Sequence, residues 1–186
     1  SSFEFFPGVP LWHSRDLVTW EQVGHVITRT PQFEAGAYRP SMGIYAPTLR
    51  HHDGVFYLIT TAVEGPEGHL LMTAADPACP WSDPVFVRGL PGFYPDIAWT
   101  DDGTCLVTYC HIVDWVPQGI HQAAINPVTG EVLEEPRLLW KGSGMQWPEG
   151  PHLIRRGDWW YLVIAEGGTE RGHAVTVARS RDPRGP

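Results

Sequence analysis

The sequence is poor in cysteine and has no long hydrophobic run. Its only cysteines are Cys79, Cys105 and Cys110. Their number is odd and no two have Cys-x-x-Cys spacing, so the sequence favours neither a disulfide framework nor a zinc site. Buried free thiols are the simpler interpretation. No apolar stretch approaches the roughly 18 residues that a membrane-spanning helix needs, and the composition is that of a soluble, globular chain.

Basic residues are also scarce, with 13 Lys and Arg against 21 Asp and Glu and a formal net charge of −8. This balance disfavours nucleic acid and anionic membranes as partners and fits a neutral ligand better. The nine histidines form no HExxH motif, and the sequence contains neither a phosphate-binding loop nor a Gly-x-Ser-x-Gly elbow. The sequence therefore indicates no metal and no cofactor.

Helical periodicity is missing as well. No window of eleven or more residues keeps apolar positions at helical spacing without an interrupting Gly or Pro, and the chain has 20 Gly and 18 Pro. Short β-branched and aromatic runs over 55–61, 105–109 and 159–165 are bounded by Asp-Gly or Gly-Asp turns. They predict the middle strands of buried sheets, and the fold class is all-β.

One strand-turn-strand pattern occurs three times, over 44–58, 93–107 and 148–162. Its turn glycines, Gly54, Gly103 and Gly157, are 49 and 54 residues apart. This period is typical of the four-stranded blades of a β-propeller. Because blades converge on one axis, polar residues at the start of each copy are expected to meet there.

A second repeated mark is a short Asx residue, at Asp16, Asp76, Asn126 and Asp182, with spacings of 60, 50 and 56 residues. Such side chains suit turns because they bond to nearby backbone amides, so we expect these marks to end the third strand of each blade. On this count residues 1–186 hold about three and a half blades of one catalytic domain. The first blade lacks its opening hairpin and the last is expected beyond residue 186.

Two carboxylates lie at corresponding places in the repeat. Glu149 stands between two prolines and beside Trp147, surroundings that raise the pKa of a carboxyl group and suit a general acid. Asp96 follows Tyr94 and Pro95 in the preceding blade, and paired carboxyls are the working parts of most glycosidases. The alternatives are a solvated Glu149 and an Asp96 that caps a strand or binds a backbone amide.

Aromatic residues near the blade starts, among them Phe3, Tyr45 and Tyr94, offer flat faces on which sugar rings can stack. His152 lies three residues after Glu149, and His173 follows a Glu-Gly-Gly-Thr loop in the same blade. Either histidine can bond a sugar hydroxyl, and a structural role is the alternative for both.

Six motifs occur in order along the whole chain: Phe3-Glu-Phe-Phe-Pro-Gly-Val-Pro, His13-Ser-Arg-Asp-Leu-Val-Thr-Trp, Gly43-Ile-Tyr-Ala-Pro-Thr, Trp99-Thr-Asp-Asp-Gly, Glu149-Gly-Pro-His-Leu, and Glu166-Gly-Gly-Thr with His173-Ala-Val-Thr-Val-Ala-Arg-Ser. Together they resemble glycoside hydrolase family 43, and most of all its β-xylosidases and α-L-arabinofuranosidases. The resemblance implies a five-bladed propeller and an inverting enzyme that uses an aspartate base, a glutamate acid and a second aspartate that tunes the acid.

By the same resemblance Glu149 corresponds to the acid, and Phe3 and Tyr45 line the first sugar subsite. The base is expected upstream of residue 1, so residues 1–186 by themselves are expected to be nearly inactive. Tyr94 occupies the place of the tuning aspartate. Side chains two apart on a strand share a face, so Asp96 is expected to substitute in part.

The leading hypothesis is thus an inverting glycosidase that releases terminal xylose or arabinofuranose from hemicellulose oligosaccharides. Rival hypotheses are a non-catalytic carbohydrate-binding propeller and a protein-interaction propeller. The sequence does not decide between xylose and arabinose, shows no calcium ligand set and leaves the oligomeric state open. It leaves the compartment open too, with the cytoplasm slightly favoured over secretion.

Overall fold

The computed structural model describes residues 2–34, 36–65, 68–78 and 80–185. These ranges contain thirteen strands and no helix, as the sequence predicted, and therefore no helix that could cross a membrane. The strands are β1 Gly8–His13, β2 Glu21–Ile27, β3 Thr48–His52, β4 Val55–Thr60, β5 His69–Ala74, β6 Val85–Val87, β7 Gly92–Trp99, β8 Cys105–Val113, β9 Val116–Ile125, β10 Arg137–Trp140, β11 Glu149–Arg156, β12 Trp159–Glu166 and β13 Ala174–Ser180.

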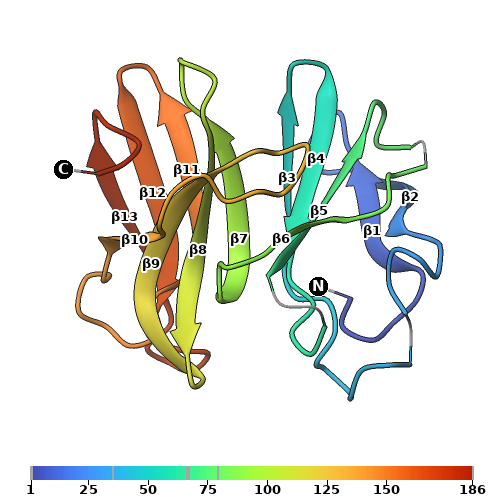
Figure 1. Cartoon of the computed structure of the whole chain (residues 1–186), viewed down its shortest axis with the longest axis horizontal. Helices are drawn as coiled ribbons and strands as arrows, with labels where there is room; N and C mark the ends of the chain where they lie inside the picture. The colour runs from blue at the N-terminus through green and yellow to red at the C-terminus, as the bar shows by residue number, and fades with distance from the viewer. Residues whose placement is uncertain (1, 35, 66–67, 79, 186) are drawn as a thin grey trace.

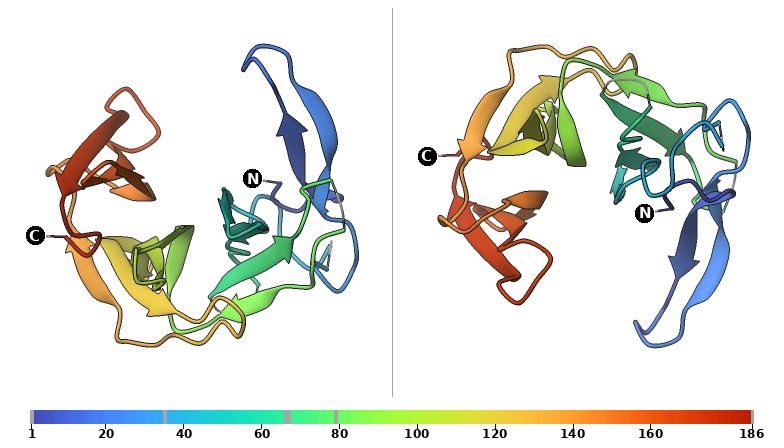
Figure 2. Two further views of the ribbon diagram at one scale, coloured as in Figure 1. Left: turned by 90° about the horizontal axis from the view of Figure 1, so that it is seen from above. Right: turned by 90° about the horizontal axis from the view of Figure 1, so that it is seen from below.

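Neighbouring strands in the sequence pair with one another in four antiparallel sheets (Figure 1). The orders are β1-β2, β3-β4-β5-β6, β7-β8-β9-β10 and β11-β12-β13. Figure 2 shows the four sheets along an arc, with β1-β2 at one end and β11-β12-β13 at the other. This confirms the all-β propeller arrangement. The extent of the domain and the number of blades in the whole protein stay predictions.

The repeated turn signals fold as expected. Asp53 and Gly54, which join β3 to β4, both have positive φ, 47° and 78°, as a tight two-residue hairpin turn requires. The Asx marks follow β1, β5, β9 and β13. At each mark a side-chain oxygen accepts a hydrogen bond from the backbone N–H two residues later, at 2.8 to 2.9 Å. The first strand of the chain, β1, is therefore equivalent to the third strand of the later sheets.

Apolar side chains fill the space between adjacent sheets. Ile27, Leu58 and Met72 belong to a cluster formed by the first two sheets, and two further clusters lie between the following pairs. Cys105 and Cys110 are buried free thiols, as predicted, and burial raises the pKa of each to about 12. Cys79 lies outside the described residues.

The first strands of three sheets, β3, β7 and β11, are neighbours. The strand β7 contacts both β3 and β11 along the concave side of the arc. Side chains on the inner faces of these strands can therefore meet although they are about 50 residues apart in the sequence. This arrangement positions the candidate site.

Candidate functional site

The strand β11 begins with a bulge that changes which side chains share a face. Glu149 pairs with Ala165 of β12, and His152 pairs with Val163, so a step of three residues on β11 matches a step of two on β12. Residues two apart on a regular strand share a face, and the bulge therefore places Glu149 and His152 on the same face. Pro151, which has no N–H to donate, falls within the bulge.

The strand β7 begins in the same way. Phe93 pairs with Cys110 of β8 and Asp96 pairs with Thr108, so Phe93 and Asp96 share a face. This corrects the expectation that simple alternation places Tyr94 and Asp96 on one face. The register shift lies between Phe93 and Asp96 and interrupts the alternation on which that expectation depended.

Glu149 is half-buried, and among the described residues no hydrogen bond or ion pair engages its carboxylate. Burial raises the pKa of Glu149, and the nearby His173 offsets part of that rise. The direction agrees with the expectation from the sequence. A carboxyl group with a raised pKa and a free oxygen can donate a proton near neutral pH.

Asp96 differs from Glu149 in its burial and in the partners of its carboxylate. Its side chain has no exposed surface. One carboxylate oxygen, Oδ2, accepts a hydrogen bond of 2.6 Å from the backbone N–H of Leu153, and the other, Oδ1, forms an ion pair of 2.8 Å with Nη2 of Arg50. The two carboxylates do come from neighbouring inner strands, but the expectation that both face an open hollow is wrong for Asp96.

The predicted aromatic positions form one connected group. Tyr45 lies 5.9 Å from Phe3, 5.5 Å from Phe93 and 5.8 Å from Tyr94, measured between ring centroids. Phe93 in turn lies 5.8 Å from Trp115, which sequence reasoning missed. The rings of Tyr45 and Tyr94 are stacked at 23°, so together they present an extended aromatic surface. Such a surface can stack against the apolar face of a sugar.

Three members of this aromatic group have an unusual backbone, and one of them is Phe3, with φ of 47°. Tyr94 has φ of 54° and Trp115 has φ of 65°, in the left-handed region that bulky residues rarely adopt. Residues in such conformations cluster at functional sites. Burial, together with the charge of Glu149, raises the pKa of Tyr94 to about 12, so its phenol is neutral at physiological pH. The effect of Glu149 shows that the two side chains are close.

The two predicted histidines, His152 and His173, both follow Glu149 in the sequence and are both accessible. His173 Nδ1 lies 2.6 Å from the carbonyl oxygen of Gly168 and therefore donates to it. His152 Nδ1 lies 3.4 Å from Nη2 of Arg50. Each histidine thus has one ring nitrogen bonded to protein and keeps Nε2 for another partner.

Sequence reasoning also missed Glu166, a buried carboxylate at the end of β12. Glu166 accepts hydrogen bonds from the backbone N–H and the hydroxyl of Ser143, both at 2.8 Å, and from the hydroxyl of Thr176 at 2.7 Å. Gly142 has φ of 84°, and a Cβ there would collide with Glu166. These contacts fix the loop that leads to Glu149. Neither Glu166 nor Arg50 has a local sequence signal for such contacts.

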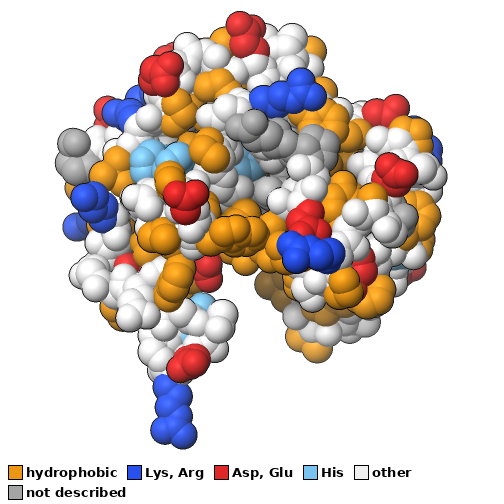
Figure 3. All heavy atoms as spheres, turned by 60° about the horizontal axis from the view of Figure 1, so that its bottom comes forward, with side chains coloured by type: hydrophobic (Ala, Val, Ile, Leu, Met, Phe, Trp, Pro, Cys, Tyr) orange, Lys and Arg blue, Asp and Glu red, His pale blue; other side chains and the backbone are white. Residues whose placement is uncertain are grey.

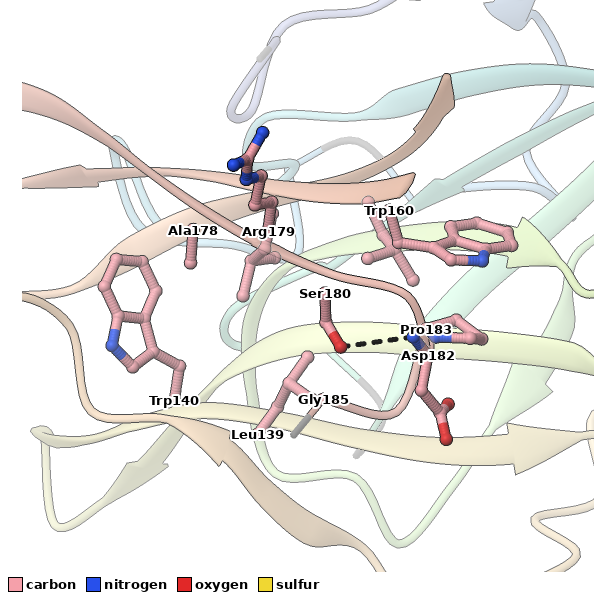
Figure 4. A pocket seen from close by; sticks show the side chains of 11 residues that line it. Leu139, Trp140, Trp160, Ala178, Arg179, Ser180, Asp182, Pro183 and Gly185 are labelled. Atoms are coloured by element: carbon pink, nitrogen blue, oxygen red, sulfur yellow. Dashed lines mark hydrogen bonds between the residues drawn. The ribbon is translucent and has the colours of Figure 1, made fainter. Parts of the chain in front are cut away.

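A separate pocket of about 180 Å³ lies between the last two sheets (Figure 4). Its walls include Leu139 and Trp140 from β10, Trp160 from β12 and Ala178 from β13. None of the predicted site residues lines it, so we do not place the functional site there. Figure 3 shows instead a notch between two lobes with hydrophobic side chains along its rim. Within the described ranges no group of three or more His, Cys, Asp or Glu could hold a metal ion.

Comparison with known proteins identifies the family to which this fold and site belong. Residues 1–186 match the family Glycosyl hydrolases family 43. The chain is 40% identical over 192 residues to a non-reducing end α-L-arabinofuranosidase of Bacteroides ovatus and 38% identical over 194 residues to a xylosidase/arabinosidase of Butyrivibrio fibrisolvens. These alignments cover 100% and 98% of this chain but 35% and 37% of the relatives.

Solved structures agree with this comparison. A xylan β-1,4-xylosidase from Bacillus halodurans superposes with a TM-score of 0.90 at 38% identity, with 100% of this chain and 37% of that chain covered. The Bacteroides ovatus structure gives a TM-score of 0.88 at 40% identity. The chain belongs to glycoside hydrolase family 43, as its motifs predicted, and it spans a little over a third of the length of these relatives.

Proposed function

We propose that the protein at its full natural length is an inverting glycoside hydrolase that releases terminal xylose or arabinofuranose from hemicellulose oligosaccharides. Residues 1–186 then form part of its propeller catalytic domain. Family membership and relatives named for xylosidase and arabinofuranosidase activity support the reaction class. The single observation that carries the proposal is Glu149, a half-buried carboxyl group with a raised pKa beside a connected aromatic surface.

Glu149 is the proposed general acid. The leaving glycosidic oxygen needs a proton as the bond to the sugar breaks, and a carboxyl group whose pKa is raised by burial holds that proton nearer to neutral pH. His173 limits the rise by favouring the ionised form. After transfer, the carboxylate regains a proton from solvent, to which it is accessible.

Inversion requires a second carboxylate that activates a water on the opposite face of the sugar, about 6.5–9.5 Å from the acid. Asp96 does not suit that task, because one of its oxygens accepts a hydrogen bond, the other is paired with Arg50, and no part of it is exposed. We therefore propose no direct chemical step for Asp96.

The proposed sugar-binding residues are Phe3, Tyr45, Tyr94, His152 and His173. The aromatic rings offer a stacking surface, and Nε2 of each histidine is available for a hydroxyl group. A neutral oligosaccharide also suits a chain of net charge −8 better than an anionic ligand does.

The test measures hydrolysis of 4-nitrophenyl β-D-xyloside and 4-nitrophenyl α-L-arabinofuranoside by the full-length protein, with Glu149→Gln as the matched variant. We expect turnover of at least one substrate, with the first-formed sugar of inverted anomeric configuration by proton NMR. A product of retained configuration contradicts the mechanism. Binding of xylo-oligosaccharides by calorimetry without any turnover favours a carbohydrate-binding propeller instead.

A further inference from the structure

Three inner strands from three different sheets meet at one polar group. Asp96 on β7 forms an ion pair with Arg50 on β3 and accepts a hydrogen bond from the backbone of Leu153 on β11. Arg50 also reaches His152 on β11, which shares a face with Glu149. The buried carboxylate is therefore connected, through one arginine, to an accessible imidazole beside the proposed acid.

The contact with Arg50 fixes which nitrogen of His152 carries the proton. A guanidinium group can only donate hydrogen bonds, so at 3.4 Å the Nδ1 atom of His152 has to be the acceptor. The proton of the neutral ring then lies on Nε2. The distance of 3.9 Å from Nδ1 to Oδ1 of Asp96 is too long for a direct hydrogen bond, so the carboxylate acts through Arg50.

Asp96 also fixes the direction of that arginine. The same atom, Nη2 of Arg50, lies 2.8 Å from Oδ1 of Asp96 and 3.4 Å from Nδ1 of His152. The contact with Asp96 is an ion pair, and the hydrogen bond that Nη2 donates goes to His152. The bond from Leu153, the residue after His152, holds the strand itself against Asp96.

We propose that Arg50 and Asp96 are positioning residues that hold His152 as a hydrogen-bond donor through Nε2 toward a hydroxyl oxygen of the sugar bound beside Glu149. This inference deepens the proposed function and rests on it for the identity of the ligand. It assigns Asp96 a role in substrate recognition in place of the catalytic role expected from the sequence.

The first measurement does not depend on activity. Long-range proton–nitrogen NMR spectra of the full-length protein labelled at histidine nitrogens report which ring nitrogen of His152 is protonated. The resonance is assigned with His152→Gln. We expect a neutral ring with the proton on Nε2 in the wild type and a mixture of tautomers in Arg50→Lys. The lysine keeps the charge next to Asp96, but its side chain is shorter and lacks the planar guanidinium group that reaches Nδ1 of His152. A wild-type proton on Nδ1 overturns the proposal whether or not the enzyme is active.

The second measurement is a double-mutant cycle on the hydrolysis of the better substrate. Arg50→Lys is expected to raise KM about fivefold with little change in kcat, the size of one lost hydrogen bond to a neutral group. In the His152→Gln background the same change should have an effect of less than about twofold, because the positioned group is gone. An equal loss in both backgrounds contradicts the proposal.

Arg29→Lys is the control for replacing an ion-paired arginine by lysine. Arg29 also forms an ion pair of 2.8 Å, with Asp83, but on the exposed surface. The Arg29→Lys variant should therefore have an unchanged KM and an unchanged His152 spectrum. If the full-length protein hydrolyses no glycoside, the proposed function fails, while the tautomer measurement still decides the positioning role.

Discussion

The strands β7 and β11 begin alike and carry carboxylates in opposite situations. Both have a bulge at the start, and each bulge includes a proline. Asp96 on β7 is fully buried and has a partner for each carboxylate oxygen. Glu149 on β11 is half-buried, and among the described residues no hydrogen bond or ion pair engages its carboxylate.

This difference distinguishes a carboxylate that stabilises the structure from one that can exchange a proton. A carboxylate that is paired with an arginine and accepts a backbone hydrogen bond holds its neighbours in place, and releasing it for proton transfer would leave a partly buried cation unpaired. A carboxyl group without partners, in surroundings that disfavour its charge, is free to exchange its proton. The two carboxylates lie at opposite ends of these bulges: Glu149 opens the bulge of β11 as Phe93 opens that of β7, and Asp96 closes the bulge of β7 as His152 closes that of β11.

The largest expected effect is on catalysis. Glu149→Gln in the full-length protein should lower kcat for a poor leaving group such as a xylobiose glycoside by about 10²–10⁴-fold, the range for loss of a general acid. For a dinitrophenyl glycoside, whose leaving group needs no proton, the loss should be far smaller. Steady-state kinetics on both substrates checks this. Equal losses on both would show that Glu149 is not the acid.

Changing the other carboxylate should affect folding more than chemistry. Asp96→Asn leaves the partly buried Arg50 without its counter-ion and weakens the contact with Leu153, so we expect a loss of about 3 kcal/mol in the free energy of unfolding. Asp83→Asn is the matched control, because its ion pair with Arg29 has the same 2.8 Å distance but lies at the surface. That change should cost less than about 1 kcal/mol. Urea unfolding at pH 7 compares the two, and similar losses would contradict the assignment.

His69, which is buried and has no counter-ion in the part of the chain that the structure describes, should make the folded protein less stable at acidic pH. Burial lowers the pKa of His69 from 6.5 to about 3, so between these values the unfolded chain binds a proton that the folded chain does not. Stability contributed by neutral His69 is therefore complete above pH 6.5 and falls as the pH is lowered toward 3.

Urea unfolding at pH 7 and at pH 4.5 measures this effect. The wild type should lose about 2 kcal/mol more between the two pH values than His69→Gln does. His51→Gln, at an exposed position, should behave like the wild type. An identical pH dependence in His69→Gln and the wild type would show that His69 does not set the limit.

The smallest effect sharpens the contrast between the two carboxylates. Because the pKa of Glu149 is raised in the folded state, its ionisation above that pKa opposes folding. Glu149→Gln should therefore stabilise the protein at pH 7, by no more than about 0.5 kcal/mol because the group is only half-buried. The same acid-to-amide change is thus expected to have opposite signs at Glu149 and at Asp96. A clear loss of stability at Glu149 would mean that it has a partner in the folded state.

Much of this fold could be predicted from local patterns. The Asp-Gly turns, the Asx marks and the short β-branched runs each depend on a few adjacent residues, and the structure places them as the sequence indicates. Glu149 could be singled out for the same reason, since prolines and an aromatic neighbour surround it in the sequence.

The partners of Asp96 could not be predicted in this way. Arg50 lies 46 residues before it and Leu153 lies 57 residues after it, and neither has a local pattern that marks it. The bulge in β7 was missed because alternation assumes a regular ladder, and only pairing with β8 shows the extra residue. Trp115 and Glu166 were missed for a related reason, since their roles depend on contacts made after folding.

The sequence by itself determined the all-β class, the repeat and the family, because turn chemistry, strand patterning and motif order are properties of neighbouring residues. Only the tertiary structure decided that the carboxylate of Asp96 has partners and that of Glu149 has none among the described residues. The state of a carboxylate depends on which donors and how much solvent surround it, and those neighbours come from strands distant in the sequence.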